Sequence, residues 1–328
     1  MQLPPKISLK CPYENAELES LIMAVENRPT LRIGFSPDPD DAFMWWALVT
    51  CDGSAEEFDT GEFQYEAVIN DIESLNQRSL IGDLEITAMS CAQYPFVSDH
   101  YAITACGASM GDAYGPKLVG RKGVKLDDLK LDGAVIAIPG ERTSAFAATN
   151  LLLGPGSFKH EVVDFKAIID GVAAGEFDAG LVIHEGQLTY ESAGLAQIVD
   201  LGQWWAGQYH GLPLPLGINT IRRDLDERFG PGTKSLITSV LLRSLEFALA
   251  HREEALAYAM QFAGDTSADL ADKFVAMYVN KWTLDFGLRG REAVRTFLSQ
   301  MHDAGLAPEV DEIDFVEPIT EKEVAADK

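Results

Sequence analysis

The 328-residue sequence has little cysteine and little histidine, and both shortages exclude classes of site. The four cysteines are Cys11, Cys51, Cys91 and Cys106. They lie far apart and form no C-x-x-C pair, so we expect free thiols in a reducing compartment rather than a disulfide framework. The six histidines lack metal-ligand spacing, since His184-Glu185 is not followed by a histidine at the offset found in zinc proteases. The sequence therefore predicts no metal centre.

Positive charge and long apolar runs are also scarce. The chain has 26 basic against 51 acidic residues, a formal net charge of −25 and a pI near 4.5. Such a charge repels phosphate backbones and anionic lipid headgroups, so we expect neither nucleic acid nor a membrane as a partner. No apolar run approaches the ~18 residues of a spanning helix, and the first residues contain no secretory signal pattern. We therefore expect a cytoplasmic protein.

Several catalytic motifs are missing as well. No G-x-G-x-x-G follows the first expected strand, and no P-loop is present, so a nucleotide cofactor is not indicated. No nucleophile elbow accompanies the histidines, so a hydrolase triad is not supported. The sequence predicts an activity, if there is one, that needs no organic cofactor.

What is present is an alternation of strand-like and helix-like segments from residue 31 to residue 222. This alternation predicts the α/β class with a largely parallel sheet, and the length predicts two domains at ~150 residues each. Strands are expected at 31–35, 64–69, 84–88, 101–106, 117–121, 134–138, 161–165, 179–183, 196–199 and 216–222. Helices are expected at 41–50, 71–80, 91–97, 143–153, 166–174 and 185–193.

Residues 234–304 have a period close to 3.6 throughout, which predicts three or four helices. One buried stripe consists of Leu236, Val240, Leu241, Leu245 and Leu249. Gly305 follows the last helix where a C′ glycine belongs. An exposed apolar stripe on these helices could support a homodimer, so that partner is left open.

Two segments rich in proline and glycine, 114–119 and 212–218, lie about 100 residues apart and predict a discontinuous domain. The chain would leave the first lobe, build the second, and return. The expected divisions are an N-terminal arm at 1–30 with a helix at 15–27, lobe one at 31–116 plus 217–316, lobe two at 117–216, and an acidic tail at 317–328. Two lobes joined by a double hinge would enclose a cleft for a small-molecule ligand.

The loop after the first strand carries three carboxylates within four positions. It reads Ser36-Pro37-Asp38-Pro39-Asp40-Asp41. Ligands in open α/β sheets bind outside the carboxyl ends of the strands, which is where this loop lies. Asp40 or Asp41 could cap the following helix, but a cap needs only one of the three. We therefore expect this loop to face the ligand.

Hydroxyl groups follow two other strands. Ser90 comes after the strand at 84–88, where an N-cap alone would explain it. Thr143 and Ser144 stand at the start of the helix at 143–153, where free N–H groups favour an anion. Because capping needs one hydroxyl, we expect the other to be available to a ligand carboxylate.

His184 stands at the tip of the apolar strand at 179–183. A lone histidine is more often structural than catalytic, but this one lies at the same sheet edge as Thr143 and Ser144. Its titration range suits general-base chemistry near neutral pH. Glu185 either orients the ring or caps the next helix.

Several of these residues stand in longer strings that resemble the 1,4-dihydroxy-6-naphthoate synthase family of the futalosine route to menaquinone. The strings are 36–43 (SPDPDDAF), 138–145 (IPGERTSA), 180–185 (GLVIHE), 200–205 (DLGQWW) and 211–217 (GLPLPLG). The resemblance runs from residue 31 to about residue 316. It implies a type II periplasmic-binding-protein-like fold used as a cytoplasmic lyase that acts on cyclic dehypoxanthine futalosine without metal or cofactor.

The same resemblance implies roles for individual residues. His184 would be the general base that starts the elimination, and Ser90, Thr143 and Ser144 would line the cleft and hold substrate oxygens. Ser36, Asp38, Asp40 and Asp41 complete the substrate-binding set that we expect.

The sequence departs from the family at the first loop, which usually reads Ser-Pro-Cys-Pro-Asn-Asp-Thr-Phe. Here Asp38 replaces the cysteine, Asp40 the asparagine and Ala42 the threonine, and Ala88 stands where many relatives have lysine. These changes make the site more negative, and Arg142 or Lys117 could compensate. Two alternatives stay open: a related eliminating enzyme such as a chorismate dehydratase-like protein, and a non-catalytic solute-binding protein of the same fold.

Overall fold

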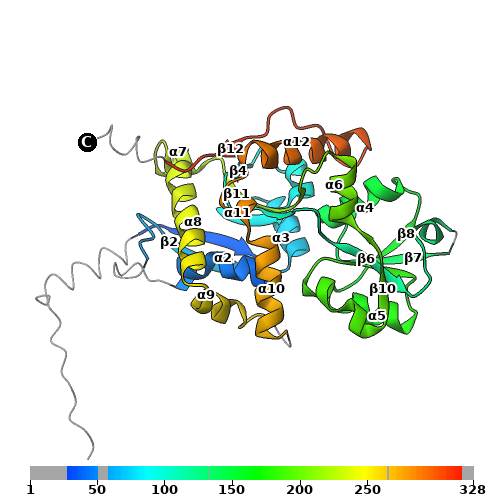
Figure 1. Ribbon diagram of the computed structural model, residues 1–328. Coiled ribbons are helices and arrows are strands. Elements are labelled where there is room, and N and C mark those ends of the chain that lie inside the picture. Colours follow the sequence, from blue (N-terminus) through cyan, green and yellow to red (C-terminus); the bar gives the residue numbers. More distant parts are fainter. Residues whose placement is uncertain (1–27, 51–57, 132, 264–265, 320–328) are drawn as a thin grey trace, which may run out of the picture.

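A computed structural model describes residues 28–50, 58–131, 133–263 and 266–319 (Figure 1). The expected helix at 15–27, Cys11, Cys51 and nearly all of the expected tail lie outside the described residues. The chain forms two sheets, each covered by helices, which confirms the α/β class. The first sheet takes its strands from chain on both sides of the segment that forms the second sheet.

The first sheet has the order β12-β4-β11-β3-β1-β2, and β5 pairs with β11. Its strands are β1 (Thr30–Phe35), β2 (Gln64–Ile69), β3 (Ile86–Ser90), β4 (Tyr101–Thr104), β5 (Ser109–Gly111), β11 (Leu214–Arg222) and β12 (Phe315–Val316). β1 runs parallel to β2 and β3, whereas β11 is antiparallel to β3, β4 and β5. The core of the sheet is therefore parallel and the returning strand is not.

The second sheet repeats this arrangement in the order β10-β6-β9-β7-β8. Its strands are β6 (Lys117–Arg121), β7 (Val135–Ile138), β8 (Lys159–Val162), β9 (Ala179–Val182) and β10 (Leu195–Asp200). β7 is parallel to β8 and β9, but β6 is antiparallel to β9 and β10. The expected largely parallel arrangement is confirmed by strand direction, since one strand in each sheet runs against the others: β11 in the first and β6 in the second. Each of these two strands enters its sheet directly from the other lobe.

Most of the expected helices have an observed helix at the same place, but not all of these are α-helices. The α-helices are α2 (Pro39–Thr50), α3 (Ile72–Ser79), α4 (Ser144–Leu153), α5 (Ile168–Ala174), α6 (Leu201–Gln208), α7 (Leu225–Phe229), α8 (Thr233–Ala250), α9 (Arg252–Ala259), α10 (Ala268–Tyr278), α11 (Lys281–Leu284) and α12 (Gly287–Asp303). The 3₁₀ turns are η1 (Cys91–Phe96), η2 (Leu126–Lys130), η3 (Glu185–Leu188) and η4 (Tyr190–Ala193). The helices expected at 91–97 and 185–193 are thus 3₁₀ turns, and the described residues from 233 to 303 form five α-helices rather than three or four.

The apolar stripe of α8 packs against other elements of the same chain. Val240, Leu241 and Leu245 are fully or almost fully buried in a cluster that also contains Phe43 and Leu48 of α2. This confirms the expected buried stripe. The homodimer stays a prediction.

The chain passes from one sheet to the other twice, between β5 and β6 and between α6 and β11. On one crossing Pro116 precedes β6, and its carbonyl accepts a hydrogen bond from Leu201 N at 2.9 Å. Lys117 Nζ and Asp200 Oδ2 form an ion pair beside it. The exact lobe boundaries stay a prediction, and the one placed between 216 and 217 falls within β11.

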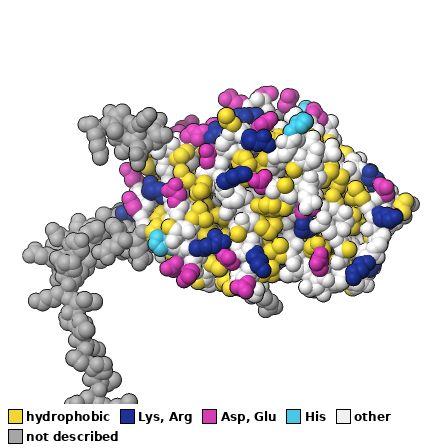
Figure 2. Space-filling view, in the orientation of Figure 1, with side chains coloured by type: hydrophobic (Ala, Val, Ile, Leu, Met, Phe, Trp, Pro, Cys, Tyr) yellow, Lys and Arg dark blue, Asp and Glu magenta, His cyan; other side chains and the backbone are white. Residues whose placement is uncertain are grey.

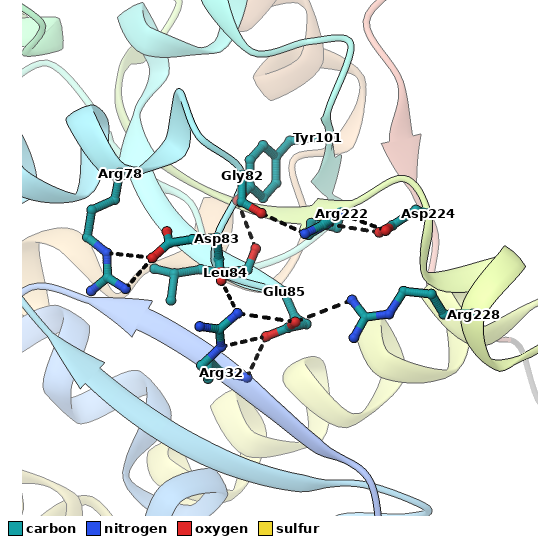
Figure 3. Close-up of polar contacts among 10 residues, drawn as sticks. All are labelled: Arg32, Arg78, Gly82, Asp83, Leu84, Glu85, Tyr101, Arg222, Asp224 and Arg228. Carbon is teal, nitrogen blue, oxygen red and sulfur yellow. Dashed lines mark hydrogen bonds and ion pairs between the residues drawn. The ribbon is translucent and has the colours of Figure 1, made fainter.

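A network of ion pairs and hydrogen bonds surrounds Glu85, which directly precedes β3 in the first sheet (Figure 3). Glu85, only 5% exposed, accepts hydrogen bonds from Arg32 N and Nε, both at 3.1 Å, and pairs with Arg228 Nη1 at 3.3 Å. Arg222 Nη1 donates to the Gly82 carbonyl at 2.6 Å. Burial alone would raise the pKa of Glu85, but the hydrogen bonds and charge of Arg32 outweigh it and hold that pKa below its usual range.

We expect Glu85→Gln to lower the free energy of unfolding at pH 7 by about 2 kcal/mol. This loss of free energy lies between the values typical of exposed ion pairs and of buried ion pairs that lose one partner, because both arginines are partly exposed. A carboxylate with a depressed folded pKa stabilises above its unfolded pKa, so the difference should vanish as pH falls below about 4. Urea denaturation at pH 7 and pH 3.5 measures this, with exposed Glu62→Gln as control. Equal losses for the two variants at pH 7 would contradict it.

On the one face that Figure 2 shows, the acidic side chains do not form a continuous surface. On the face shown in Figure 2, lysine and arginine side chains lie among the acidic ones, with apolar side chains between them. Within the described ranges no helix is long and apolar enough to cross a membrane.

Candidate active site

A cleft lies between the two lobes. It is lined by Ser36, Asp38, Asp40, Asp41, Ile72, Ser90, Ser109, Pro116, Thr143, Ser144, Ala145, Ile183, Leu216, Gly217, Phe274 and Tyr278. Seven of the eight residues predicted for the site are in this lining. The eighth, His184, is not, although Ile183 directly before it is. The structure therefore brings the three predicted loops together at one cleft.

The loop between β1 and α2 folds back on itself. Asp41 Oδ2 accepts a hydrogen bond from Ser36 N at 2.9 Å, and Asp40 Oδ2 accepts one from Ser109 Oγ at 3.1 Å. The expectation that Asp40 or Asp41 caps the helix was wrong, because α2 begins earlier, at Pro39. Proline suits the first helical position, where its fixed φ is already helical. Both aspartates lie in the first turn and point their carboxyls toward the site.

These three carboxyls are unusually weak acids. Burial, followed by the charge of Asp41, raises the pKa of Asp40 to about 8. Burial also raises the pKa of Asp38, with further contributions from the charges of Asp40 and Glu185, and it raises that of Asp41. At neutral pH Asp40 is therefore mostly protonated and acts as a hydroxyl-like group. The loop carries less negative charge into the cleft than its sequence suggests.

We expect Asp40→Asn to stabilise the protein in a pH-dependent way. An acid whose folded pKa is raised favours the folded state only while protonated, so wild-type stability is lost as pH rises from about 4 toward about 8. The amide cannot ionise, so the variant should melt on the order of 5 °C higher at pH 8 and at nearly the same temperature at pH 4. Thermal melts at both values measure this, with exposed Asp311→Asn as control. A variant that melts lower at pH 8 would contradict the neutral state of Asp40.

Ser90 lies at the end of β3, but its side chain makes no capping bond to η1. Its Oγ accepts a hydrogen bond from Asn76 Nδ2 at 3.1 Å, and Asn76 Oδ1 accepts from Ser90 N at 2.9 Å. Asn76 is fully buried on α3. Ser90 is therefore the N-cap residue of η1 by position, but its hydroxyl bonds to Asn76, which fixes it against the cleft.

Thr143 and Ser144 both make hydrogen bonds within the protein, whereas we expected one of the two hydroxyls to be available to a ligand. Thr143 is the N-cap of α4, and its hydroxyl accepts from Phe146 N at 3.2 Å. Ser144 Oγ donates to the Leu216 carbonyl at 2.6 Å and accepts from Ala92 N at 3.1 Å. Both hydroxyls line the cleft, but Ser144 also ties α4 to η1 and β11. A ligand oxygen that bonds to either hydroxyl would therefore share it with the protein partners that the hydroxyl already has.

His184 is 8% exposed and has both ring nitrogens in hydrogen bonds. Nε2 lies 3.0 Å from the Phe165 carbonyl, so it carries the proton, and Nδ1 accepts from Gly186 N at 2.9 Å. The ring is thereby the N-cap of η3. Burial lowers the pKa of His184, while the charge of Glu185 opposes this. The imidazole is therefore neutral near pH 7, and Nδ1 is the nitrogen with a lone pair.

Glu185 lies beside this nitrogen, with Oε2 3.7 Å from Nδ1. Its other oxygen accepts a hydrogen bond from Thr266 Oγ1 of the first lobe at 2.8 Å. The carboxylate therefore bonds to the facing lobe, and it makes no hydrogen bond to Nδ1, which carries no proton.

Nine residues of the lining were not among the predicted site residues, and these include Ser109, Phe274 and Tyr278. Phe274 and Tyr278 belong to α10, where helical spacing indicated only core packing. Ser109 precedes the crossing, and β5 is too short for its period to be recognised. The proline in the 114–119 segment marked the crossing but not these side chains.

The two cations suggested as compensators do not line the cleft. Lys117 pairs with Asp200, and Arg142 Nη1 donates to Gln93 Oε1 at 3.3 Å while its guanidinium lies 4.6 Å from the Phe96 ring centre. Among the described residues, no three of His, Cys, Asp and Glu are grouped as metal ligands. The cleft offers a ligand hydroxyls, weakly acidic carboxyls and two aromatic rings.

Residues 31–303 match a family described as menaquinone biosynthesis. The chain is 39% identical to a 1,4-dihydroxy-6-naphtoate synthase of Thermus thermophilus, over 84% of this chain and 96% of that protein. It is 32% identical to the protein of the same name from Streptomyces coelicolor, over 85% and 95%.

Solved structures agree on the fold. A protein of Archaeoglobus fulgidus superposes with a TM-score of 0.74 and 36% identity, over 84% of this chain and 98% of that one. An alkanesulfonate-binding protein of Xanthomonas axonopodis pv. citri superposes with a TM-score of 0.59 at 14% identity, over 86% and 96%. The latter likeness confirms the periplasmic-binding-protein-like architecture.

Proposed function

Because the chain belongs to the 1,4-dihydroxy-6-naphthoate synthase family of menaquinone biosynthesis, we propose that it is a cytoplasmic lyase that converts cyclic dehypoxanthine futalosine to 1,4-dihydroxy-6-naphthoate. One observation carries the proposal: the likeness to two synthases covers at least 95% of each of them. The matched residues include every described loop that lines the cleft.

In this proposal the cleft holds the substrate by hydrogen bonds rather than by a cation. The hydroxyls of Ser36, Ser90, Thr143 and Ser144 lie on both lobes, so closure would surround the substrate with donors and acceptors. Asp38, Asp40 and Asp41 join them as weak acids. A protonated Asp40 can donate a hydrogen bond as an asparagine does, which accounts for its place where relatives have asparagine. The extra acids then repel a carboxylate substrate less than their number implies.

His184 would act as the general base through Nδ1. For this the ring must exchange the Gly186 N–H for a substrate proton, while Nε2–H stays on the Phe165 carbonyl. The electron pair released by proton removal would break the bond to the sugar-derived fragment, and the imidazolium would return its proton to that fragment. A short movement of η3 supplies the access that this step needs.

A substrate-specificity assay tests the substrate class. The full chain is incubated separately with cyclic dehypoxanthine futalosine, chorismate and an alkanesulfonate, and products are identified by mass spectrometry. The proposal predicts that only the futalosine compound is consumed. Consumption of chorismate would favour a dehydratase-like enzyme, and binding without consumption of any compound would favour a solute-binding protein.

A further inference from the structure

Helix α10 stands between the two lobes and contacts both (Figure 1). Its last residue, Tyr278, lines the cleft and is 3% exposed. The Tyr278 ring packs edge-on against Tyr114 in the crossing segment, with ring centres 5.9 Å apart. The Tyr114 hydroxyl in turn donates to the Met277 carbonyl of α10. The end of α10 is therefore attached to the hinge between the lobes.

From this position Tyr278 reaches the second lobe. Its hydroxyl donates to Gln187 Oε1 at 2.8 Å, and Gln187 is 2% exposed. The Nε2 of the same amide has no hydrogen-bond partner in the described part of the chain. A buried amide that loses its remaining partner must move toward water or pay the full desolvation penalty. The Tyr278 hydroxyl thus holds the Gln187 side chain in its buried position.

Gln187 belongs to η3, the short turn that begins directly after His184. Gln187 N donates to the His184 carbonyl at 2.9 Å, and Gly186 N donates to His184 Nδ1 at the same distance. A second bond from the first lobe, Thr266 Oγ1 to Glu185 Oε1 at 2.8 Å, reaches the same turn. Two residues of the first lobe therefore hold the turn that sets the imidazole.

We infer that Tyr278 is a positioning residue: through Gln187 it holds η3, and thereby His184, in register with the facing lobe when the cleft is closed. The catalytic consequence rests on the proposed function, whereas the positioning itself does not. When the lobes separate, both interlobe bonds break and η3 is released. The general base is then correctly placed only around an enclosed substrate, which couples proton removal to closure.

Kinetics separate this role from direct contact with substrate. Tyr278→Phe keeps the ring and removes only the hydroxyl, and Gln187→Met removes its acceptor without touching the cleft lining. We expect each to lower kcat about tenfold, which is 1.4 kcal/mol, with KM changed by less than about threefold. The double variant should be no slower than either single one, because both remove the same bond. Tyr258→Phe on α9 is the matched control, with kcat expected at the wild-type value.

Histidine ring-nitrogen NMR gives a readout that needs no turnover. In the wild type we expect one tautomer of His184, protonated at Nε2, with the signal assigned by its loss in His184→Asn. The charged groups around the ring are Glu185, Asp164 and Lys166. In Tyr278→Phe the released turn should admit water, so that the tautomers mix and the His184 pKa rises toward its ordinary value of about 6.5.

The outcomes are distinct. A Tyr278→Phe variant with wild-type His184 signals overturns the inference, as does a variant that raises KM while Gln187→Met has no effect. Additive losses in the double variant also overturn it. If the wild type does not convert the futalosine compound, the proposed function fails, and the ring-nitrogen signals still decide the positioning role.

Discussion

His184→Asn is expected to lower kcat for cyclic dehypoxanthine futalosine by about 10²–10⁴-fold, the usual contribution of a general base. Asparagine is itself a good N-cap, so its carbonyl can accept the Gly186 N–H in place of Nδ1. The substitution therefore removes the titrating nitrogen while keeping the local fold. Steady-state kinetics and calorimetric binding of the same compound measure the two effects separately, and binding should weaken by less than tenfold, or about 1.4 kcal/mol.

The pH dependence belongs to the same prediction. Burial lowers the pKa of His184, so the acidic limb of wild-type kcat should lie below about pH 6.5, and activity should persist at pH values where a free imidazole is half protonated. His160→Asn is the control, since His160 is exposed and pairs only at the surface with Glu141 at 2.9 Å. Near-normal turnover by His184→Asn would show that another group removes the proton.

Gly202→Ala is expected to cost about 3 kcal/mol of folding free energy, the upper end of overpacking. A Cβ at position 202 would lie 1.9 Å from the Tyr114 carbonyl oxygen, and backbone cannot yield as a flexible side chain can. The contact joins the first crossing segment to the start of α6, so the added methyl would push α6 away from that segment beside the Lys117–Asp200 pair.

Gly207→Ala provides a matched control on the same helix. Gly207 is exposed on α6 and has open space where its Cβ would be. Alanine there should stabilise by about 0.5–1 kcal/mol, because glycine is a poor helix former. Urea denaturation of both variants measures the contrast. If Gly202→Ala unfolds at the wild-type midpoint, the close approach of Tyr114 to α6 is wrong.

The predictable part of this protein is what depends on neighbouring residues. Most of the expected strands coincide with observed ones to within two residues at each end, and the largest displacement is at 161–165, where β8 spans Lys159–Val162. The Thr143 cap and Gly305, with φ 72° after α12, follow from local propensity alone. Loops that follow parallel strands lie at one edge of their sheet by geometry, which groups Ser36 with Ser90 on the first sheet and Thr143 with His184 on the second.

What could not be predicted depends on contacts distant in sequence. Asp40 and Ser109 are 69 residues apart, and Gln187 and Tyr278 are 91 apart. No period or spacing marks such pairs. The direction of β6 and β11 likewise follows from which lobe the chain leaves, not from the strands themselves. For His184, sequence indicated the residue but not that Gly186 and Phe165 occupy both of its nitrogens.

A single-turnover reaction decides whether this cleft performs a base-initiated cleavage or only binds its ligand. The full-length wild-type chain is mixed in excess over cyclic dehypoxanthine futalosine, mass spectrometry follows the bound compound, and His184→Asn is run in parallel. We predict that the wild type converts all of the compound to 1,4-dihydroxy-6-naphthoate and the sugar-derived fragment, while the variant binds it and leaves it intact over the same time. Recovery of the bound compound unchanged from the wild type would contradict the lyase function and leave a binding protein on this fold.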